Sequence, residues 1–386
     1  MFKLKSSSDM LVLAYVLGVL GAFLQISGGT WDVASHVMKI VETFFTLPHL
    51  ILYAGVGLSL LASLAGLVIR PAVSRSDGLQ PALFTGLKVS LVGGVLQLVA
   101  APFDFWWHST YGFDPHLFTP SHSILITGII LSGVGMAIGT TRLAQATRLG
   151  LFLGRFSLGR WLSVLAVVSL STLWLDLNGL VYLITDVDGL NYTFHLGDAW
   201  VNQAAPVQFV TVGILLAGIG GLVVLTTKRT LGWTGAVSAV TFLTAIVVAS
   251  ADLGFRAWYL ANSTDPANVA NSSIIASFIP LQLIFVTPIV LFDLAVRSSW
   301  SRTRAALAAI LIAPFASYLD GFYSLILWTN GIHNPVTSLP FSRLMVIAAL
   351  AVPMLIAGTV ATVYQAQFGN LLASSRLSIR QKLGVK

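Results

Sequence analysis

Residues 47–69 read LPHLILYAGVGLSLLASLAGLVI, and this stretch decides the class of fold. It contains no Asp, Glu, Lys or Arg. It is long enough to cross the hydrocarbon core of a bilayer, about 30 Å thick, as one helix. A strand does not fit, because the apolar residues do not alternate and a backbone in lipid must satisfy its polar groups within the segment. The stretch therefore predicts a membrane-spanning α-helix.

The rest of the chain has the same character. Of its 386 residues 56% are hydrophobic and 9% are charged, against roughly 25% charged in an ordinary soluble domain. The mean hydropathy is +0.86. We predict an all-α, polytopic integral membrane protein with ten spanning helices, at residues 10–28, 47–69, 84–103, 119–141, 161–182, 207–227, 231–251, 273–296, 303–328 and 340–366.

Basic residues set the predicted orientation. With the N-terminus inside, most of the 21 Lys and Arg residues fall into loops on one side, which the positive-inside rule makes the cytoplasmic side. Both termini are then cytoplasmic in a multi-pass protein of the cell membrane. The net charge of +7 reflects this topology and contact with the lipid bilayer, so it indicates no nucleic-acid partner.

An internal repeat organises the sequence. An aspartate recurs at the predicted outer end of each odd-numbered span, at intervals of 72, 72, 76 and 68 residues: Asp32, Asp104, Asp176, Asp252 and Asp320. The unit is a helical hairpin of two spans, and five such hairpins make the chain. We expect residues 1–141 to form a pair of metal-site hairpins. Residues 142–386 form three further hairpins, which act as scaffold or substrate surface.

The first two hairpins resemble each other beyond the aspartate. They read LQISGGTWDVASHVMKIVETFFTLPHLILYAG and LQLVAAPFDFWWHSTYGFDPHLFTPSHSILITG. The later hairpins lack the histidine four residues after the aspartate, where they have Leu180, Arg256 and Ser324. Duplication explains this pattern, with the chemistry retained in the first two units.

A doubled set of acids and histidines carries the predicted chemistry. The first hairpin has D-x3-H-x5-E-x6-H and the second D-x3-H-x5-D-x7-H, formed by Asp32, His36, Glu42 and His49, and by Asp104, His108, Asp114 and His122. An acid and a histidine four residues apart share one helix face. The last histidine opens the next span, so the hairpin folds it back onto that pair. The three residues are predicted metal ligands in each hairpin, and interfacial helix capping is the alternative.

The acid between the two histidines has a separate predicted role. Glu42 is the sole glutamate of the chain, and a carboxylate at a membrane boundary is costly enough to suggest function. We expect Glu42 and Asp114 to hold the ligands or to move protons during catalysis. His116, in the same loop as Asp114, is a candidate to support the ligands. Asp293 and Arg297, far along the chain, are predicted to form an ion pair along one helix.

The ligand types narrow the choice of metal. The chain has no cysteine, so nitrogen and oxygen must hold the ion. Imidazole with carboxylate suits copper, zinc or iron, and the Irving–Williams order favours copper at equal geometry. Copper is therefore the predicted cofactor, with zinc or iron as alternatives.

The D-x3-H-x12-H run of Asp32, His36 and His49 resembles the copper-ligand motif in the C subunit of the copper membrane monooxygenases, the particulate methane and ammonia monooxygenase family. The similarity covers about residues 10–140, and Asp104 and His108 fall where that family has a second pair. The resemblance implies one copper on the first three residues and a neighbouring site that Asp104 and His108 share with His49. This chain is longer and has no cupredoxin-like domain, so any partner subunits would be separate chains.

Three functions follow as hypotheses. The first is a copper-dependent, monooxygenase-like oxidoreductase acting on a small apolar or lipid-derived substrate, with its site near the extracytoplasmic side. The second is a transition-metal transporter or metal-delivery protein, which would need polar residues continuing inward from the site. The third is a haem-binding electron carrier with axial histidines, although the acids beside each histidine suit a bare metal ion better.

Overall fold

A computed structural model gives the fold, and it describes residues 7–37, 43–69, 81–112, 116–148, 156–262 and Asp293. These residues form helices joined by short connections, with no strand among them. The all-α prediction is confirmed over this part of the chain. The last three predicted spans, 273–296, 303–328 and 340–366, lie outside the described residues apart from Asp293.

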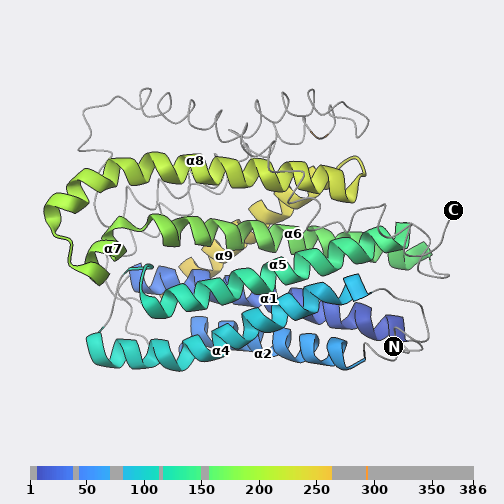
Figure 1. The fold of residues 1–386 in the computed structure, drawn as a ribbon, viewed down its shortest axis with the longest axis horizontal. Coiled ribbons are helices and arrows are strands. Elements are labelled where there is room, and N and C mark those ends of the chain that lie inside the picture. The colour runs from blue at the N-terminus through green and yellow to red at the C-terminus, as the bar shows by residue number, and fades with distance from the viewer. Residues whose placement is uncertain are drawn as a thin grey trace.

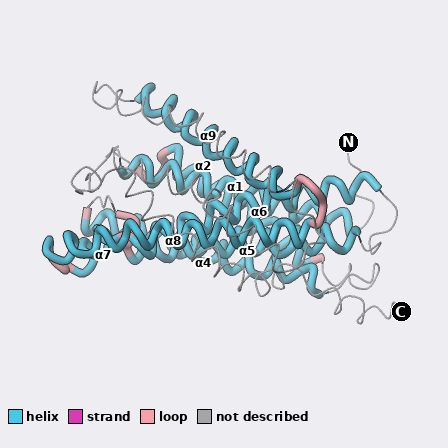
Figure 2. The backbone as a smooth tube through the Cα atoms, turned by 90° about the horizontal axis from the view of Figure 1, so that it is seen from above, coloured by secondary structure: helices cyan, strands magenta, loops and turns pink. Residues whose placement is uncertain are grey.

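The helices follow the predicted order. They are α1 (Ser7–Val37), α2 (Leu47–Val68), η1 (Pro81–Phe84), α4 (Thr85–Tyr111), α5 (Pro120–Arg148), α6 (Phe156–Thr185), α7 (Val187–Phe194), α8 (Asp198–Leu231) and α9 (Ala236–Asn262). The long helices lie side by side along one direction (Figure 1). Only α9 crosses them obliquely, as the view at right angles makes clear (Figure 2).

Five of these helices are long and apolar enough to cross a membrane: Asp9–Asp32, Leu47–Val68, Thr85–Tyr111, Pro120–Gln145 and Leu162–Thr185. They coincide with the first five predicted spans. The sixth predicted span lies within α8, and the apolar part of α9 is shorter, Ala236–Val247.

On α2, large apolar side chains lie on the surface and small polar ones are buried. On α2 the small polar side chains Ser59 and Ser63 are buried, while Leu61 and Val68 are 69% and 77% exposed. Lipid tails are as apolar as leucine, so helices in a membrane associate through small residues that allow close approach rather than through large apolar ones. The exposed leucines and valines thus suit a lipid-facing surface.

Glycines set the distance between the paired helices. A Cβ atom built on Gly55 of α2 would lie 2.7 Å from the Gly21 carbonyl oxygen of α1. A Cβ on Gly128 of α5 would likewise lie 2.7 Å from the Gly93 carbonyl oxygen of α4. The two helix pairs, α1 with α2 and α4 with α5, are therefore in backbone contact at corresponding places.

Two buried glutamines join the helix pairs to each other. Gln97 Nε2 donates to Gln25 Oε1 at 3.0 Å, and Gln25 Nε2 donates to the Gly55 carbonyl at 3.1 Å and to Ser59 Oγ at 2.9 Å. Gln97 Nε2 also lies 3.2 Å from Ser132 Oγ. The two amides occupy the same place in the sequence pattern, seven residues before Asp32 and Asp104, so the helix pairs meet at matching positions.

Asp293 forms a second buried polar contact, and its predicted partner cannot be compared with it. Arg297 lies outside the described residues, and the Asp293 carboxylate accepts hydrogen bonds from Lys228 Nζ at 2.6 Å and from Ser238 N and Oγ, both at 3.0 Å. Lys228 belongs to α8 and Ser238 to α9. Asp293 therefore joins these two helices to a distant part of the chain, a contact that the local i,i+4 spacing does not reveal.

Candidate metal centre

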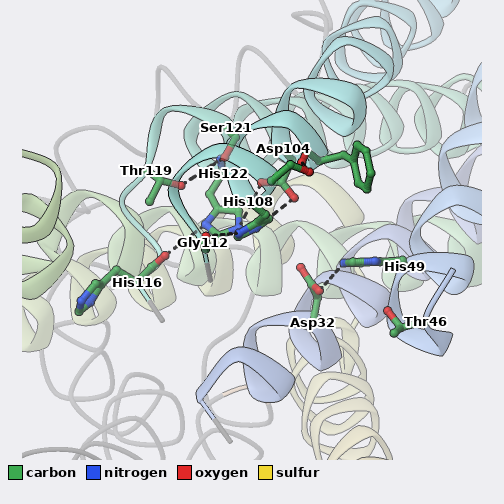
Figure 3. Close-up of polar contacts among 12 residues, drawn as sticks. Asp32, Thr46, His49, Asp104, His108, Gly112, His116, Thr119, Ser121 and His122 are labelled. Atoms are coloured by element: carbon green, nitrogen blue, oxygen red, sulfur yellow. Dashed lines mark hydrogen bonds and ion pairs between the residues drawn. The ribbon is translucent and has the colours of Figure 1, made fainter. Parts of the chain in front are cut away.

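Asp104, His108 and His122 bring three ligand atoms together at one end of the helix bundle (Figure 3). The Asp104 carboxylate lies between the two imidazoles, 3.5 Å from His108 Nε2 and 3.5 Å from His122 Nε2. One ligand atom from each residue lies within 4.8 Å of the others. The spacing of the second hairpin predicted this grouping of three.

Local structure explains how the three residues meet. Asp104 and His108 are four residues apart on α4, so they occupy one face of its last turns. Gly112 ends α4 with φ at +86°, a backbone conformation that favours glycine, and its N–H donates to the His108 carbonyl. The chain turns back there, and α5 begins at Pro120, so that His122 lies in the first turn of α5.

Backbone carbonyls orient both imidazoles. His122 Nδ1 lies 3.1 Å from the His116 carbonyl oxygen, and His108 Nδ1 lies 3.3 Å from the Gly112 carbonyl oxygen. When Nδ1 carries the proton and donates to these carbonyls, Nε2 presents its lone pair toward Asp104. Metal-binding histidines in proteins are commonly held in this way.

The two carboxylate–imidazole separations fit a metal ion of ordinary size. With metal–ligand bonds of about 2.1 Å, neighbouring ligands of a tetrahedral site are roughly 3.4 Å apart. The two carboxylate–imidazole separations of 3.5 Å are close to this value and longer than an ordinary hydrogen bond of about 2.7–3.2 Å. Three protein ligands also leave a fourth position for a substrate or water, as in catalytic sites.

The first hairpin brings together two of its predicted ligands. His49 Nε2 lies 2.8 Å from Asp32 Oδ1, and His49 Nδ1 lies 2.9 Å from the Thr43 carbonyl oxygen. His36 lies on α1, but its side chain is outside the description, and Glu42 lies outside the described residues. Asp114 of the second hairpin also lies outside them.

The two hairpins hold their last histidine in the same manner. In each, Nε2 points to the aspartate and Nδ1 to the carbonyl six residues earlier, which is Thr43 for His49 and His116 for His122. The resemblance implied that His49 joins Asp104 and His108. In the structure His122 lies beside that pair, while His49 lies beside Asp32.

Aromatic side chains connect the two clusters. The Phe44 ring lies 5.1 Å from that of Tyr53 and 5.6 Å from that of Phe105, which comes from α4. Tyr53 in turn stacks on His49, with ring centroids 5.9 Å apart. The clusters are therefore neighbours (Figure 3). Both lie at the end of the bundle where α1 and α4 end and α2 and α5 begin. We call this end the site end.

One residue that contacts the loop beside the site was not singled out from the sequence. Asp186, between α6 and α7, accepts hydrogen bonds from the backbone N–H groups of Leu117 and Phe118, in the loop that leads to His122. An acid that precedes a short helix is a recognisable N-cap signal. That signal does not reveal which distant loop the carboxylate also reaches.

Comparisons with protein-family models, with curated proteins and with solved structures found no match for this chain. The likeness to the copper membrane monooxygenases stays a hypothesis that depends on five residues and their spacing.

Proposed function

We propose that this protein is a multi-pass membrane metalloprotein. It binds a transition-metal ion, preferably copper, through Asp104, His108 and His122. The observation that carries the proposal is the convergence of three ligand atoms from two apolar helices within 4.8 Å. A single carboxylate with two imidazoles suits copper, zinc or iron. The acid also supplies the negative charge that the bound cation requires.

The proposed activity is oxidation of a small apolar or lipid-derived substrate. Copper, when bound, supplies one-electron redox chemistry and the activation of dioxygen. The chain provides an open ligand position, two imidazoles whose orientation is fixed by backbone carbonyls, and surrounding helices whose leucines and valines face outward. A substrate dissolved in the bilayer would reach such a site laterally.

The first hairpin is proposed to hold a second ion. Asp32 and His49 would be two of its ligands, and His36 the third, since it follows Asp32 by four residues as His108 follows Asp104. Glu42 and Asp114, in the intervening loops, would hold ligands or transfer protons. This assignment predicts up to two ions per chain.

We further propose that the whole chain consists of five helical hairpins, with ten spans in all. The matching glycine contacts of Gly55 and Gly128 and the matching glutamines Gln25 and Gln97 support duplication of the first unit. The positive-inside rule would place both termini in the cytoplasm and the site end on the extracytoplasmic side.

Metal analysis of the purified protein tests the proposal. The protein is extracted in mild detergent, loaded with Cu(II), desalted and analysed by mass spectrometry of the elements, and we expect one or two ions per chain. His108→Asn and His122→Asn should each remove one ion, because asparagine can still donate to the carbonyl but lacks Nε2. His195→Asn is the matched control, since His195 is exposed and its φ of +53° suits asparagine. A protein that retains no metal, or equal retention in all variants, would refute the proposal.

Transport is the rival function for the same ligands. It requires a polar path inward from Asp32 and Asp104. The residues two helical turns below are Gln25 and Gln97, which are buried and hydrogen-bonded to each other and to neighbouring helices. Such mutual pairing favours a closed interior over a hydrated path. Metal uptake into proteoliposomes would establish transport, and a Soret band in the purified protein would establish haem binding.

A further inference from the structure

Asp186 lies at the junction of α6 and α7 and contacts the loop of a different hairpin. Its Oδ2 accepts hydrogen bonds from Leu117 N at 2.8 Å and from Phe118 N at 3.0 Å. Its Oδ1 accepts from Gly189 N at 2.9 Å and so caps α7. One carboxylate therefore fixes two backbone segments that are about 70 residues apart in the sequence.

Further contacts attach the same loop to α7. Thr193 Oγ1 donates to the Phe118 carbonyl at 2.8 Å, and the His116 ring lies 5.1 Å from that of Tyr192. The loop thus has three kinds of contact with α7 and the residue that caps it: charge-assisted hydrogen bonds, a neutral hydrogen bond and ring packing. The charge-assisted bonds to Asp186 are the strongest type of the three.

The fixed loop carries the carbonyl that orients His122. Leu117 and Phe118, which donate to Asp186, directly follow His116, and the His116 carbonyl accepts from His122 Nδ1. A shift of the loop would move this carbonyl and rotate the imidazole about its Cβ. The Nε2 atom would then move away from the Asp104 carboxylate.

We propose that Asp186 is a positioning residue of the second metal site, through which the third hairpin holds His122 in its metal-binding orientation. The inference rests on the proposed metal binding at Asp104, His108 and His122. Asp186 acts through the backbone of residues 116–118 and does not touch the metal. The third hairpin has no histidine four residues after its own aspartate, Asp176, so it has no ligand set of this kind. Its role in this proposal is to support the site of the second hairpin through Asp186.

The first hairpin supports its histidine differently. The Thr43 carbonyl accepts from His49 Nδ1, and the same residue's hydroxyl oxygen accepts from Phe45 N at 3.4 Å. The corresponding loop residues, Phe44 and Phe45, take the places of Leu117 and Phe118 in the sequence pattern. Loss of Asp186 should therefore weaken the second site and leave the first unchanged.

The test compares Asp186→Ala and Asp186→Asn with Asp198→Asn. Asp198 is an exposed acid in the first turn of α8, so its variant removes the same charge near the same end without touching the loop. Cu(II) affinity is measured by competition with a chelator, the ligand field by electron paramagnetic resonance, and the loop by hydrogen exchange of the peptide containing Leu117 and Phe118 in metal-free protein.

We expect Asp186→Ala to weaken one Cu(II) site by about 10- to 100-fold, as supporting residues of metal ligands generally do, and to alter its copper hyperfine splitting. Hydrogen exchange at the loop should accelerate. Asp186→Asn should recover part of the affinity, because its amide oxygen can still accept hydrogen bonds from the loop. Its amide nitrogen cannot accept the hydrogen bond from Gly189 N, so the cap of α7 is lost. Asp198→Asn should behave as wild type.

The outcomes separate this inference from the proposed function. A wild-type protein that binds no Cu(II) refutes metal binding itself. A wild-type protein that binds Cu(II), with Asp186→Ala unchanged in affinity and spectrum, refutes the role of Asp186 alone. Should Asp186→Ala fail to fold, as judged by size-exclusion chromatography, Asp186→Ser is tested instead, because serine can still cap α7 but has no carboxylate to hold the loop. Wild-type affinity, spectrum and hydrogen exchange in that variant give the same refutation.

Discussion

Two glycines on one helix should respond in opposite ways to the same substitution. A Cβ atom at Gly55 would lie 2.7 Å from both Gln25 N and the Gly21 carbonyl oxygen, whereas at Gly57 it would meet nothing within 4 Å. Ordinary contact begins near 3.4 Å, so Gly55→Ala must separate α1 and α2 by about 0.7 Å. Overpacking of this kind costs about 1–3 kcal/mol. The gain in helix propensity, about 1 kcal/mol, is the same at both sites and cancels in the comparison.

We therefore expect Gly55→Ala to be less stable than Gly57→Ala by about 1–3 kcal/mol in reversible unfolding by denaturing detergent. Gly57→Ala should equal or exceed the wild type. Separation of α1 from α2 should also lengthen the Asp32–His49 contact, so one bound metal ion should be lost or weakened in Gly55→Ala only. Equal stability of the two variants would refute the close backbone packing on which the hairpin geometry depends.

Three further predictions concern polar contacts between helices. Asp104→Asn should abolish metal retention at the second site while its circular dichroism stays that of wild type; retention of both ions would show that the carboxylate is not a ligand. Gln97→Ala should destabilise the protein by about 1–3 kcal/mol, because Gln25 Oε1 loses its donor in a buried place, and a thermal unfolding curve like that of wild type would contradict this. Lys228→Met should lower the free energy of unfolding by about 3–5 kcal/mol, because the Asp293 carboxylate stays buried without its cation. The double variant Lys228→Met/Asp293→Leu should recover most of this stability. If it does not, the loss comes from packing and not from the unpaired charge.

Composition and length alone predicted the spanning helices. The five helices able to cross a membrane coincide with the first five predicted spans, because a long apolar run has no other stable form in lipid. The contact of Asp104 with His108 was also predictable, since a spacing of four residues on one helix fixes their proximity regardless of the rest of the fold. The count of ten spans and five hairpins stays a prediction.

The grouping of ligands across helices was decided by the tertiary structure. The sequence placed His49 and His122 at the start of two spans. The doubled pattern predicted that each joins the aspartate of its own hairpin, whereas the resemblance implied that His49 is also shared with Asp104 and His108. Two features of the tertiary structure, the path of each loop and the rotation of each helix, place His49 beside Asp32 and His122 beside Asp104. No local spacing encodes these quantities, because they depend on contacts between helices.

Asp186 and Asp293 both contact segments that are distant from them in the sequence. Asp186 and Asp293 each lie beside residues that suggest a local role, as an N-cap and as an i,i+4 partner. The structure shows that Asp186 also holds a loop of another hairpin and that Asp293 accepts from Lys228. A single sequence determines which segments enter the membrane, since hydrophobicity is a property of each segment. Only the folded chain determines which polar groups meet, because a hydrogen bond requires two partners whose positions are set by all the helices between them.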